Sequence, residues 1–138
     1  MQPLILNVDD YDPGRYARTK VLKQAGFSVM EAATGRETVR LVTEHHPSLI
    51  LLDVNLPDIN GFEVCRQIKS NPRTKASTVV HISASSVLTD HQVQGLECGA
   101  DSYLVEPIDP RVLIATVRAS STLTGRGLAC VLPLGIVS

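Results

Sequence analysis

Carboxylates stand where two aliphatic segments of the chain end. Asp9 and Asp10 follow the segment Leu4–Val8, and Asp53 closes the segment Ser48–Asp53. Three neighbouring carboxylates repel one another, so at least one pKa would rise without compensation. Mg²⁺ removes this repulsion, because it prefers oxygen ligands, takes one or two carboxylates and often completes its shell with water and phosphate oxygens. An aspartate pair by itself is as often a loop or helix cap, but a third carboxylate on a neighbouring strand favours a Mg²⁺ site.

The elements that must position these residues follow an alternating pattern. Short aliphatic segments alternate with longer segments of helical periodicity, which predicts an α/β fold with a doubly wound, five-stranded parallel sheet and five helices. The predicted strands are Leu4–Val8, Phe27–Glu31, Ser48–Asp53, Thr78–Ser83 and Ser102–Val105. Ligands of such sheets bind outside the carboxyl ends of the strands. The polar residues expected to meet at that edge are Asp9, Asp10, Asp53, Ser83 and Glu106.

The predicted helices carry start signals and apolar stripes. Three of them begin with a capping residue and a suitable partner: Thr34 with Glu37, Asn60 with Glu63, and Asp109 with Pro110. The first helix has a predicted buried stripe of Ala17, Val21, Leu22 and Ala25. The fourth helix is predicted from about Thr89 to Cys98.

Composition narrows the functional classes. The chain has 138 residues, 43% hydrophobic and 20% charged, which suits one globular domain. Its net charge of −1 gives no general attraction for polyanions, so we expect no direct contact with nucleic acid and no membrane contact by this domain. Cys65, Cys98 and Cys130 lack the spacing of a zinc site or a disulfide framework, and the amino terminus lacks the features of a signal peptide. We therefore expect a cytoplasmic location.

These segments resemble the receiver domains of two-component signalling, the CheY-like domains of response regulators. The similarity spans about Pro3 to Ala119 and rests on ILNVDD, LILLDVNLPDINGFEV, VVHISAS and GADSYLVEP. Its specific part is the D-x-x-x-P-x-x-x-G spacing that begins at Asp53. The resemblance implies a flavodoxin-like fold with strand order 2-1-3-4-5.

The resemblance also implies roles in a phosphorelay. Asp53 would accept a phosphoryl group from the phosphohistidine of a histidine kinase or phosphotransfer protein. Asp9, Asp10 and the backbone carbonyl of Asn55 would hold Mg²⁺ together with Asp53. The cation would neutralise charge on the transferred group and align donor and acceptor. Such a domain at most catalyses its own phosphorylation and dephosphorylation.

Two further residues match the family pattern. Ser83 would hydrogen-bond the phosphoryl group, and Tyr103 would be the aromatic switch that turns inward in response. Taken alone, a strand-end hydroxyl is more commonly bonded to backbone, and an edge-strand aromatic is more commonly just half-buried.

Glu106 departs from the family pattern. Receiver domains ordinarily carry a lysine before the proline that follows the fifth strand, and here the pair is Glu106-Pro107, whose peptide bond the resemblance implies to be cis. A fourth carboxylate leaves Mg²⁺ as the only evident counter-charge, so Glu106 would turn to solvent, become protonated or add to metal affinity. We expect phosphorylation that is slower or less switch-like than in the family, and a stronger response when lysine is restored.

Two other functions are open at this point. A pseudo-receiver would keep the fold as a protein-interaction module without phosphorylation, and Glu106 is the main argument for it. A flavin protein or phosphatase on the same scaffold is disfavoured, because the loop DDYDPGR is acidic rather than glycine-rich and Asn55 stands where a phosphatase would carry a second aspartate.

The wider context follows from the resemblance. We expect a receiver domain over residues 1–121 and, over residues 122–138, a tail, a linker or expression-derived sequence. The opening LNVDDYDPGRYART is similar to amino-terminal receivers of hybrid sensor histidine kinases. Homodimers would form through the predicted fourth helix, the fifth strand and the last helix.

Overall fold

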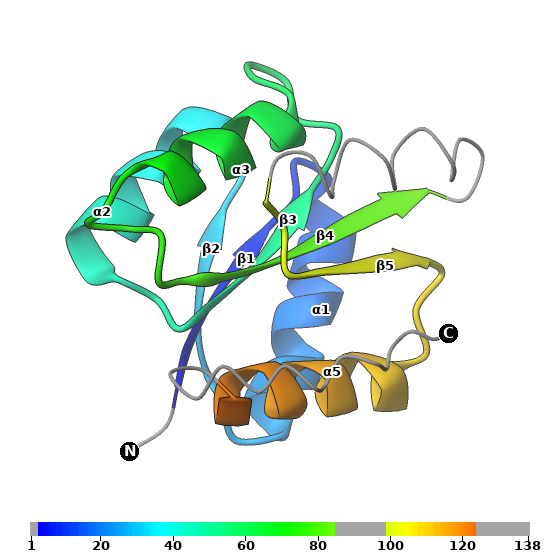
Figure 1. Ribbon diagram of the computed structural model, residues 1–138. Coiled ribbons are helices and arrows are strands. Elements are labelled where there is room, and N and C mark those ends of the chain that lie inside the picture. Colours follow the sequence, from blue (N-terminus) through cyan, green and yellow to red (C-terminus); the bar gives the residue numbers. More distant parts are fainter. Residues whose placement is uncertain (1–2, 85–98, 124–138) are drawn as a thin grey trace.

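Five parallel strands form the centre of the fold (Figure 1). The computed structural model describes residues 3–84 and 99–123. The strands are β1 (Leu4–Val8), β2 (Ser28–Ala32), β3 (Leu49–Asp53), β4 (Thr78–Ala84) and β5 (Ser102–Glu106). Their order in the sheet is β2-β1-β3-β4-β5, which confirms the predicted fold class. Each predicted strand lies within one residue of the observed bounds at either end.

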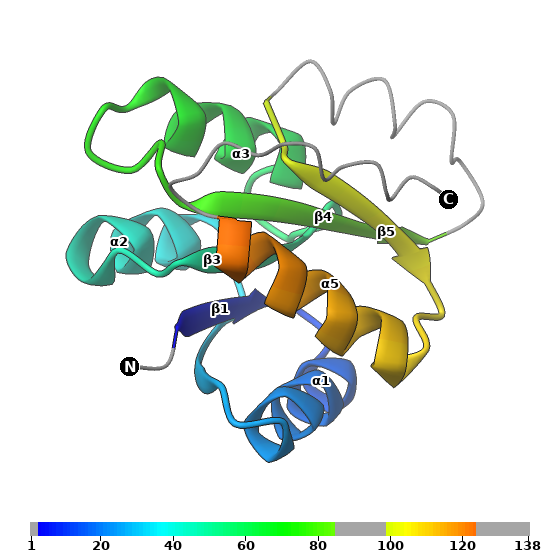
Figure 2. The same cartoon turned by 60° about the horizontal axis from the view of Figure 1, so that its bottom comes forward.

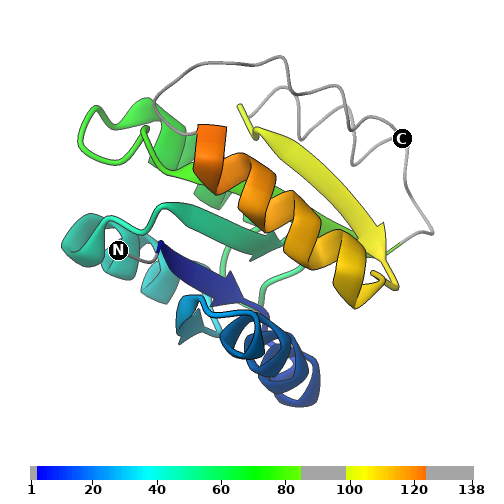
Figure 3. The same ribbon diagram turned by 90° about the horizontal axis from the view of Figure 1, so that it is seen from below.

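Helices cover both faces of this sheet. The helices are α1 (Asp12–Gln24), α2 (Gly35–His45), α3 (Gly61–Ser70) and α5 (Pro110–Leu123). Figures 1 and 2 show α2 and α3 on one face and α1 and α5 on the other. Viewed from below, α1 and α5 lie in front of the strands (Figure 3). The helix predicted from about Thr89 to Cys98 lies outside the described residues.

Side-chain alternation along the central strands divides the apolar core into two layers. Leu6 and Val8 of β1 pack in the layer that contains residues of α2 and α3. Ile5, their neighbour on β1, packs in the layer that contains residues of α1 and α5. Because β1 and β3 are buried on both faces, each must be aliphatic almost throughout, as the sequence pattern indicated.

The capping predictions are confirmed at three helices. The side chain of Thr34 accepts a hydrogen bond from the Glu37 amide at 3.1 Å, and that of Asn60 accepts one from the Phe62 amide at 2.7 Å. Asp109 Oδ1 accepts a hydrogen bond from the Arg111 amide at 2.8 Å. These bonds satisfy amides that have no partner inside their helix.

The buried side of α1 differs from the predicted stripe. Leu22 is buried as expected, but Ala17 is exposed and Arg18 and Thr19 are buried instead. The face of α1 toward the sheet is therefore partly polar. In the described part of the chain, every helix is too short or too polar to cross a membrane.

Candidate functional site

Three aspartates meet at the carboxyl edge of the sheet, as predicted. One carboxylate oxygen from each of Asp9, Asp10 and Asp53 lies within 4.8 Å of the others. Strands β1 and β3 are neighbours with Val8 beside Leu52, which sets the residues that follow these positions next to each other. Asp9 is buried, Asp53 is half-buried and Asp10 is exposed. The cluster is thus open to solvent on one side.

The pKa of Asp53 is shifted by its place in this cluster. Its pKa is raised to about 7, mainly by burial and further by the charges of Asp9 and Asp10. The Asn55 amide opposes this shift, because it donates a hydrogen bond to Asp53 Oδ1 at 3.0 Å. Burial is thus the main cause of the raised pKa of Asp53, and the repulsion expected between neighbouring carboxylates adds to it.

These donors fit a hard divalent cation. Three carboxylates of mixed exposure offer oxygen ligands while the open side leaves room for water or phosphate oxygens. A cation here would also remove the repulsion that raises the Asp53 pKa. The role of the Asn55 carbonyl as a further ligand stays a prediction.

The loop after Asp53 is held in place by hydrogen bonds from backbone amides. The Gly61 amide donates to the Val54 carbonyl at 2.8 Å, and a Cβ atom on residue 61 would overlap the backbone of Asp53. Asp58 accepts hydrogen bonds from the amides of Gly35, at 2.8 Å, and of Arg36, at 3.0 Å, and thereby ties the loop to the start of α2. These contacts explain why the D-x-x-x-P-x-x-x-G spacing ends in glycine.

Glu106 forms an ion pair that was not predicted from the sequence, while its side chain remains about half exposed. Its Oε2 accepts a hydrogen bond at 2.9 Å from Nη2 of Arg18, a residue of α1. The same Nη2 lies 3.5 Å from Asp9 Oδ2. Mg²⁺ is therefore not the only counter-charge available to the carboxylates, and that expectation was wrong. The Glu106-Pro107 peptide bond is cis, as predicted.

Asn7 completes the surroundings of Arg18. It lies fully buried in β1, and its Oδ1 accepts a hydrogen bond from Arg18 Nη1 at 3.1 Å. Its Nδ2 donates to the Arg15 carbonyl at 3.0 Å and to Thr19 Oγ1 at 2.9 Å. Both oxygen and nitrogen of this side chain are used, so Asn7 fixes the orientation of the guanidinium.

Ser83 and Tyr103 lie where the sequence placed them. Ser83 is buried near the end of β4, one strand away from Asp53, whose partner in the register is Ile82. Tyr103 pairs with His81 in the register of β4 and β5, and its hydroxyl is buried with no hydrogen-bond partner in the described part of the chain. Their roles in phosphoryl binding and switching stay predictions.

Two residues of the site, Arg18 and Asn7, were missed by sequence reasoning. The signals were present: Asn7 interrupts the aliphatic segment LILNV, and Arg18 stands one helical turn before the buried Leu22. A polar residue at a position expected to be buried indicates a buried partner.

Comparisons with known proteins agree with this geometry. The family pattern of the response regulator receiver domain matches residues 5–118. Transcriptional regulatory protein AfsQ1 of Streptomyces coelicolor is 43% identical over 85% of this chain and 50% of its own length. Protein PilH of Pseudomonas aeruginosa is 34% identical over 83% of this chain and 94% of its own length.

Solved structures show the same likeness. The crystal structure of the signal receiver domain of a signal transduction histidine kinase from Syntrophus aciditrophicus matches with a TM-score of 0.83 and 29% identity. The match covers 92% of this chain and 96% of that one. The chain spans about half the length of the first curated relatives it matches.

Proposed function

Since the chain belongs to the response regulator receiver domain family of two-component signalling, we propose that it accepts a phosphoryl group on Asp53 from a phosphohistidine. The observation that carries the proposal is the meeting of Asp9, Asp10 and Asp53 within 4.8 Å at the carboxyl edge of the sheet. In this site Asp9, Asp10, Asp53 and the backbone carbonyl of Asn55 hold Mg²⁺. The donor is a histidine kinase or a phosphotransfer protein.

The reaction is a transfer between two nucleophiles. A carboxylate oxygen of Asp53 forms a bond to phosphorus while the bond from phosphorus to the imidazole nitrogen of the donor breaks, and the electron pair stays on that nitrogen. Bound Mg²⁺ supplies positive charge that neutralises the oxygens of the transferred group. The Asn55 amide holds Oδ1 of Asp53 and so fixes the direction of the carboxylate. Ser83 hydrogen-bonds the phosphoryl group, and Tyr103 transmits its arrival.

The proposal extends to the protein's setting. The domain works in the cytoplasm, binds neither nucleic acid nor membrane itself, and either stands alone or serves as the amino-terminal receiver of a hybrid sensor kinase. It catalyses at most its own phosphorylation and dephosphorylation. Homodimers use β5, α5 and the helix predicted from about Thr89 to Cys98, and the receiver domain proposed for residues 1–121 extends to the end of α5 at Leu123.

Intact mass spectrometry tests the phosphoacceptor. The protein is incubated with a small acyl phosphate and Mg²⁺, beside an Asp53→Asn variant and a sample with chelator. We expect the mass of one phosphoryl group to be added to the wild type only, and only with the metal. An adduct that persists in Asp53→Asn places the acceptor elsewhere and rejects the assignment.

A pseudo-receiver is the second candidate, and the pairing of Glu106 with Arg18 favours it, because a carboxylate stands where the family carries a cation. Beryllofluoride with Mg²⁺ mimics an aspartyl phosphate. A receiver will bind it and shift the NMR signals of Tyr103, whereas a pseudo-receiver will show neither adduct nor shift.

A further inference from the structure

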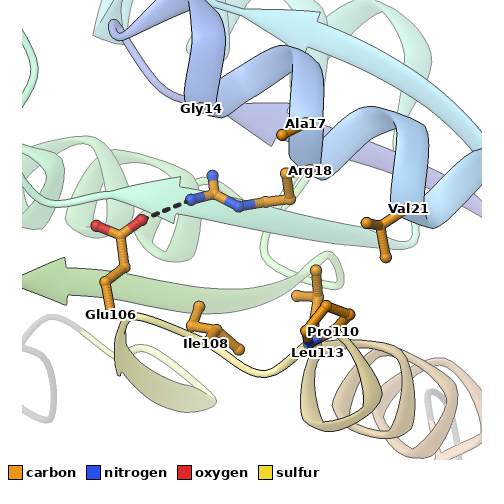
Figure 4. A pocket seen from close by; sticks show the side chains of 8 residues that line it. All are labelled: Gly14, Ala17, Arg18, Val21, Glu106, Ile108, Pro110 and Leu113. Carbon is orange, nitrogen blue, oxygen red and sulfur yellow. Dashed lines mark hydrogen bonds and ion pairs between the residues drawn. The ribbon is translucent and has the colours of Figure 1, made fainter.

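Arg18 is a buried cation shared between two carboxylates. Its side chain is 8% exposed, and its Nη2 lies 2.9 Å from Glu106 and 3.5 Å from Asp9. Figure 4 shows Arg18 reaching from α1 and Glu106 reaching from the end of β5 toward each other. The shorter distance belongs to Glu106, so the guanidinium pairs more closely with this residue than with Asp9.

No other basic side chain of the described residues forms an ion pair with Asp9, Asp10 or Asp53. Arg15 is the basic residue nearest to Asp9 in sequence. It forms ion pairs with Asp12 and Glu31 and contacts Asp9 only at the backbone carbonyl. Among the described residues, the acidic cluster therefore forms an ion pair with one cation, Arg18, which Glu106 also contacts.

Asn7 and Glu106 both contact Arg18, but they differ in how firmly they are held. Asn7 is fully buried and holds Nη1, so the guanidinium cannot leave without losing a buried hydrogen bond. The Glu106 side chain is 47% exposed and borders a pocket of about 200 Å³ between α1 and the segment after β5. Glu106 is thus the member of the pair that can move, and Arg18 is the member that stays beside Asp9.

We propose that Arg18 is a positioning residue of the acidic site, which limits its affinity for Mg²⁺ through Asp9, and that Glu106 sets the strength of this effect. The inference rests on the proposed function in taking Asp9, Asp10 and Asp53 as the Mg²⁺ ligands. It adds that the metal affinity is set by a charge pair outside the ligand set.

Removing either charge alone is expected to change the affinity for Mg²⁺, and the two changes have opposite directions. Arg18→Met takes away the cation and leaves Glu106 unpaired, so the site becomes more negative and binds Mg²⁺ more tightly. Glu106→Gln leaves the full charge of Arg18 on Asp9, so the site binds Mg²⁺ more weakly. At these separations one charge changes the affinity by roughly threefold to tenfold. The double variant removes one charge of each sign and returns near the wild-type value.

The experiment is a calorimetric titration with Mg²⁺ and no phosphodonor, since the chain has no tryptophan to report binding. A matched control exists on α2, where Arg40 and Glu44 form an exposed pair at 3.2 Å on the other face of the sheet. Arg40→Met and Glu44→Gln change the same charges and are expected to leave the dissociation constant unchanged. Arg18→Lys keeps the charge and is expected to stay closer to the wild type than Arg18→Met.

Shifts in the same direction for Arg18→Met and Glu106→Gln, or shifts no larger than those of the α2 controls, overturn the proposal. If Arg18→Met does not fold, the test rests on Glu106→Gln, which keeps the shape of a half-exposed side chain. A Mg²⁺ dissociation constant of Glu106→Gln that is unchanged or tighter than that of the wild type counts against the proposal. A wild type that binds no Mg²⁺ rejects both the metal site and this inference. A missing Asp53 adduct with opposite shifts present rejects only the phosphoacceptor role.

Discussion

Gly61 packs directly against the backbone of Asp53. A Cβ atom on residue 61 would overlap the Asp53 carbonyl oxygen and lie 2.8 Å from Cα of Val54. Both obstacles are backbone atoms of the strand end that carries the proposed acceptor, so neither can rotate away. The start of α3 and the end of β3 are in contact because residue 61 has no side chain.

Gly61→Ala should destabilise the domain by about 1–3 kcal/mol, because the added methyl group forces the loop after Asp53 to shift. Urea unfolding followed by circular dichroism measures the change. Gly14→Ala is the control, since the nearest atom to its Cβ would be in the exposed side chain of Tyr11, which can turn away. Equal stability of the two variants would contradict the close packing.

Asp53→Asn should stabilise the metal-free protein, and more so as the pH rises from about 4 to about 7. The folded pKa of Asp53 is about 7 and the ordinary value is 3.8, so the wild type has its full stability below the ordinary value and loses it on ionisation in this range. Because the carboxylate is half exposed, the gain at neutral pH is on the order of 1–2 kcal/mol. Unfolding in chelator at about pH 5 and about pH 8 measures it.

Asp109→Asn is the matched control for this titration. The pKa of Asp109 is lowered to about 2, first by the side chain of Arg111, so its stabilising effect is lost only as the pH falls toward that value. This variant should be slightly less stable than the wild type, by the same amount at both pH values. Saturating Mg²⁺ should reduce the stability that Asp53→Asn gains over the wild type. A stability gain that does not depend on pH would contradict the raised pKa of Asp53.

Glu106→Lys is expected to disturb the site rather than to restore it. A lysine at position 106 would stand beside Arg18, which now lies 2.9 Å from Glu106, and two cations would repel each other. The stronger response expected from the sequence should therefore need Glu106→Lys together with Arg18→Met. Beryllofluoride-induced NMR shifts near Tyr103 compare the two variants.

The double variant should show larger NMR shifts than Glu106→Lys. Its affinity for beryllofluoride should also be higher by roughly threefold, because one of two neighbouring like charges has been removed. A single Glu106→Lys variant that responds as well as the double variant would show that Arg18 does not interfere.

Asn7→Val should cost about 1–3 kcal/mol, because Nη1 of Arg18 and Oγ1 of Thr19 each lose the buried hydrogen bond that they make with Asn7. Adding Arg18→Met removes one of these orphaned groups, so the two substitutions should cost less together than the sum of their separate costs. Thermal unfolding of the four proteins gives the coupling. Additive costs would mean that Asn7 does not hold Arg18.

The sheet and the aspartate cluster could be predicted because both depend on short-range patterns. An aliphatic run such as Leu49–Asp53 indicates a buried strand, and the topology of a parallel sheet then brings the residues after the strands to one edge. The same reasoning anticipated that like charges would raise the pKa of a carboxylate here, although burial is the larger cause at Asp53.

The pairing of Arg18 with Glu106 could not be predicted in this way. A helical stripe is read from apolar residues, so Ala17 was included in the buried stripe and Arg18 was not. In the structure Ala17 is exposed and Arg18 is buried. An arginine is buried here because Asn7 and two carboxylates satisfy it. Asn7 and Asp9 come from the end of β1, and Glu106 comes from the end of β5. Only the tertiary arrangement brings them together.

The ion pair of Arg18 and Glu106 also joins the beginning of the domain to its end. The two residues are 88 positions apart, and β5 is both the last of the described strands in sequence and an edge strand of the sheet. A contact over 88 positions is a long-range one, and contacts of this kind raise the contact order of a fold, which slows its folding.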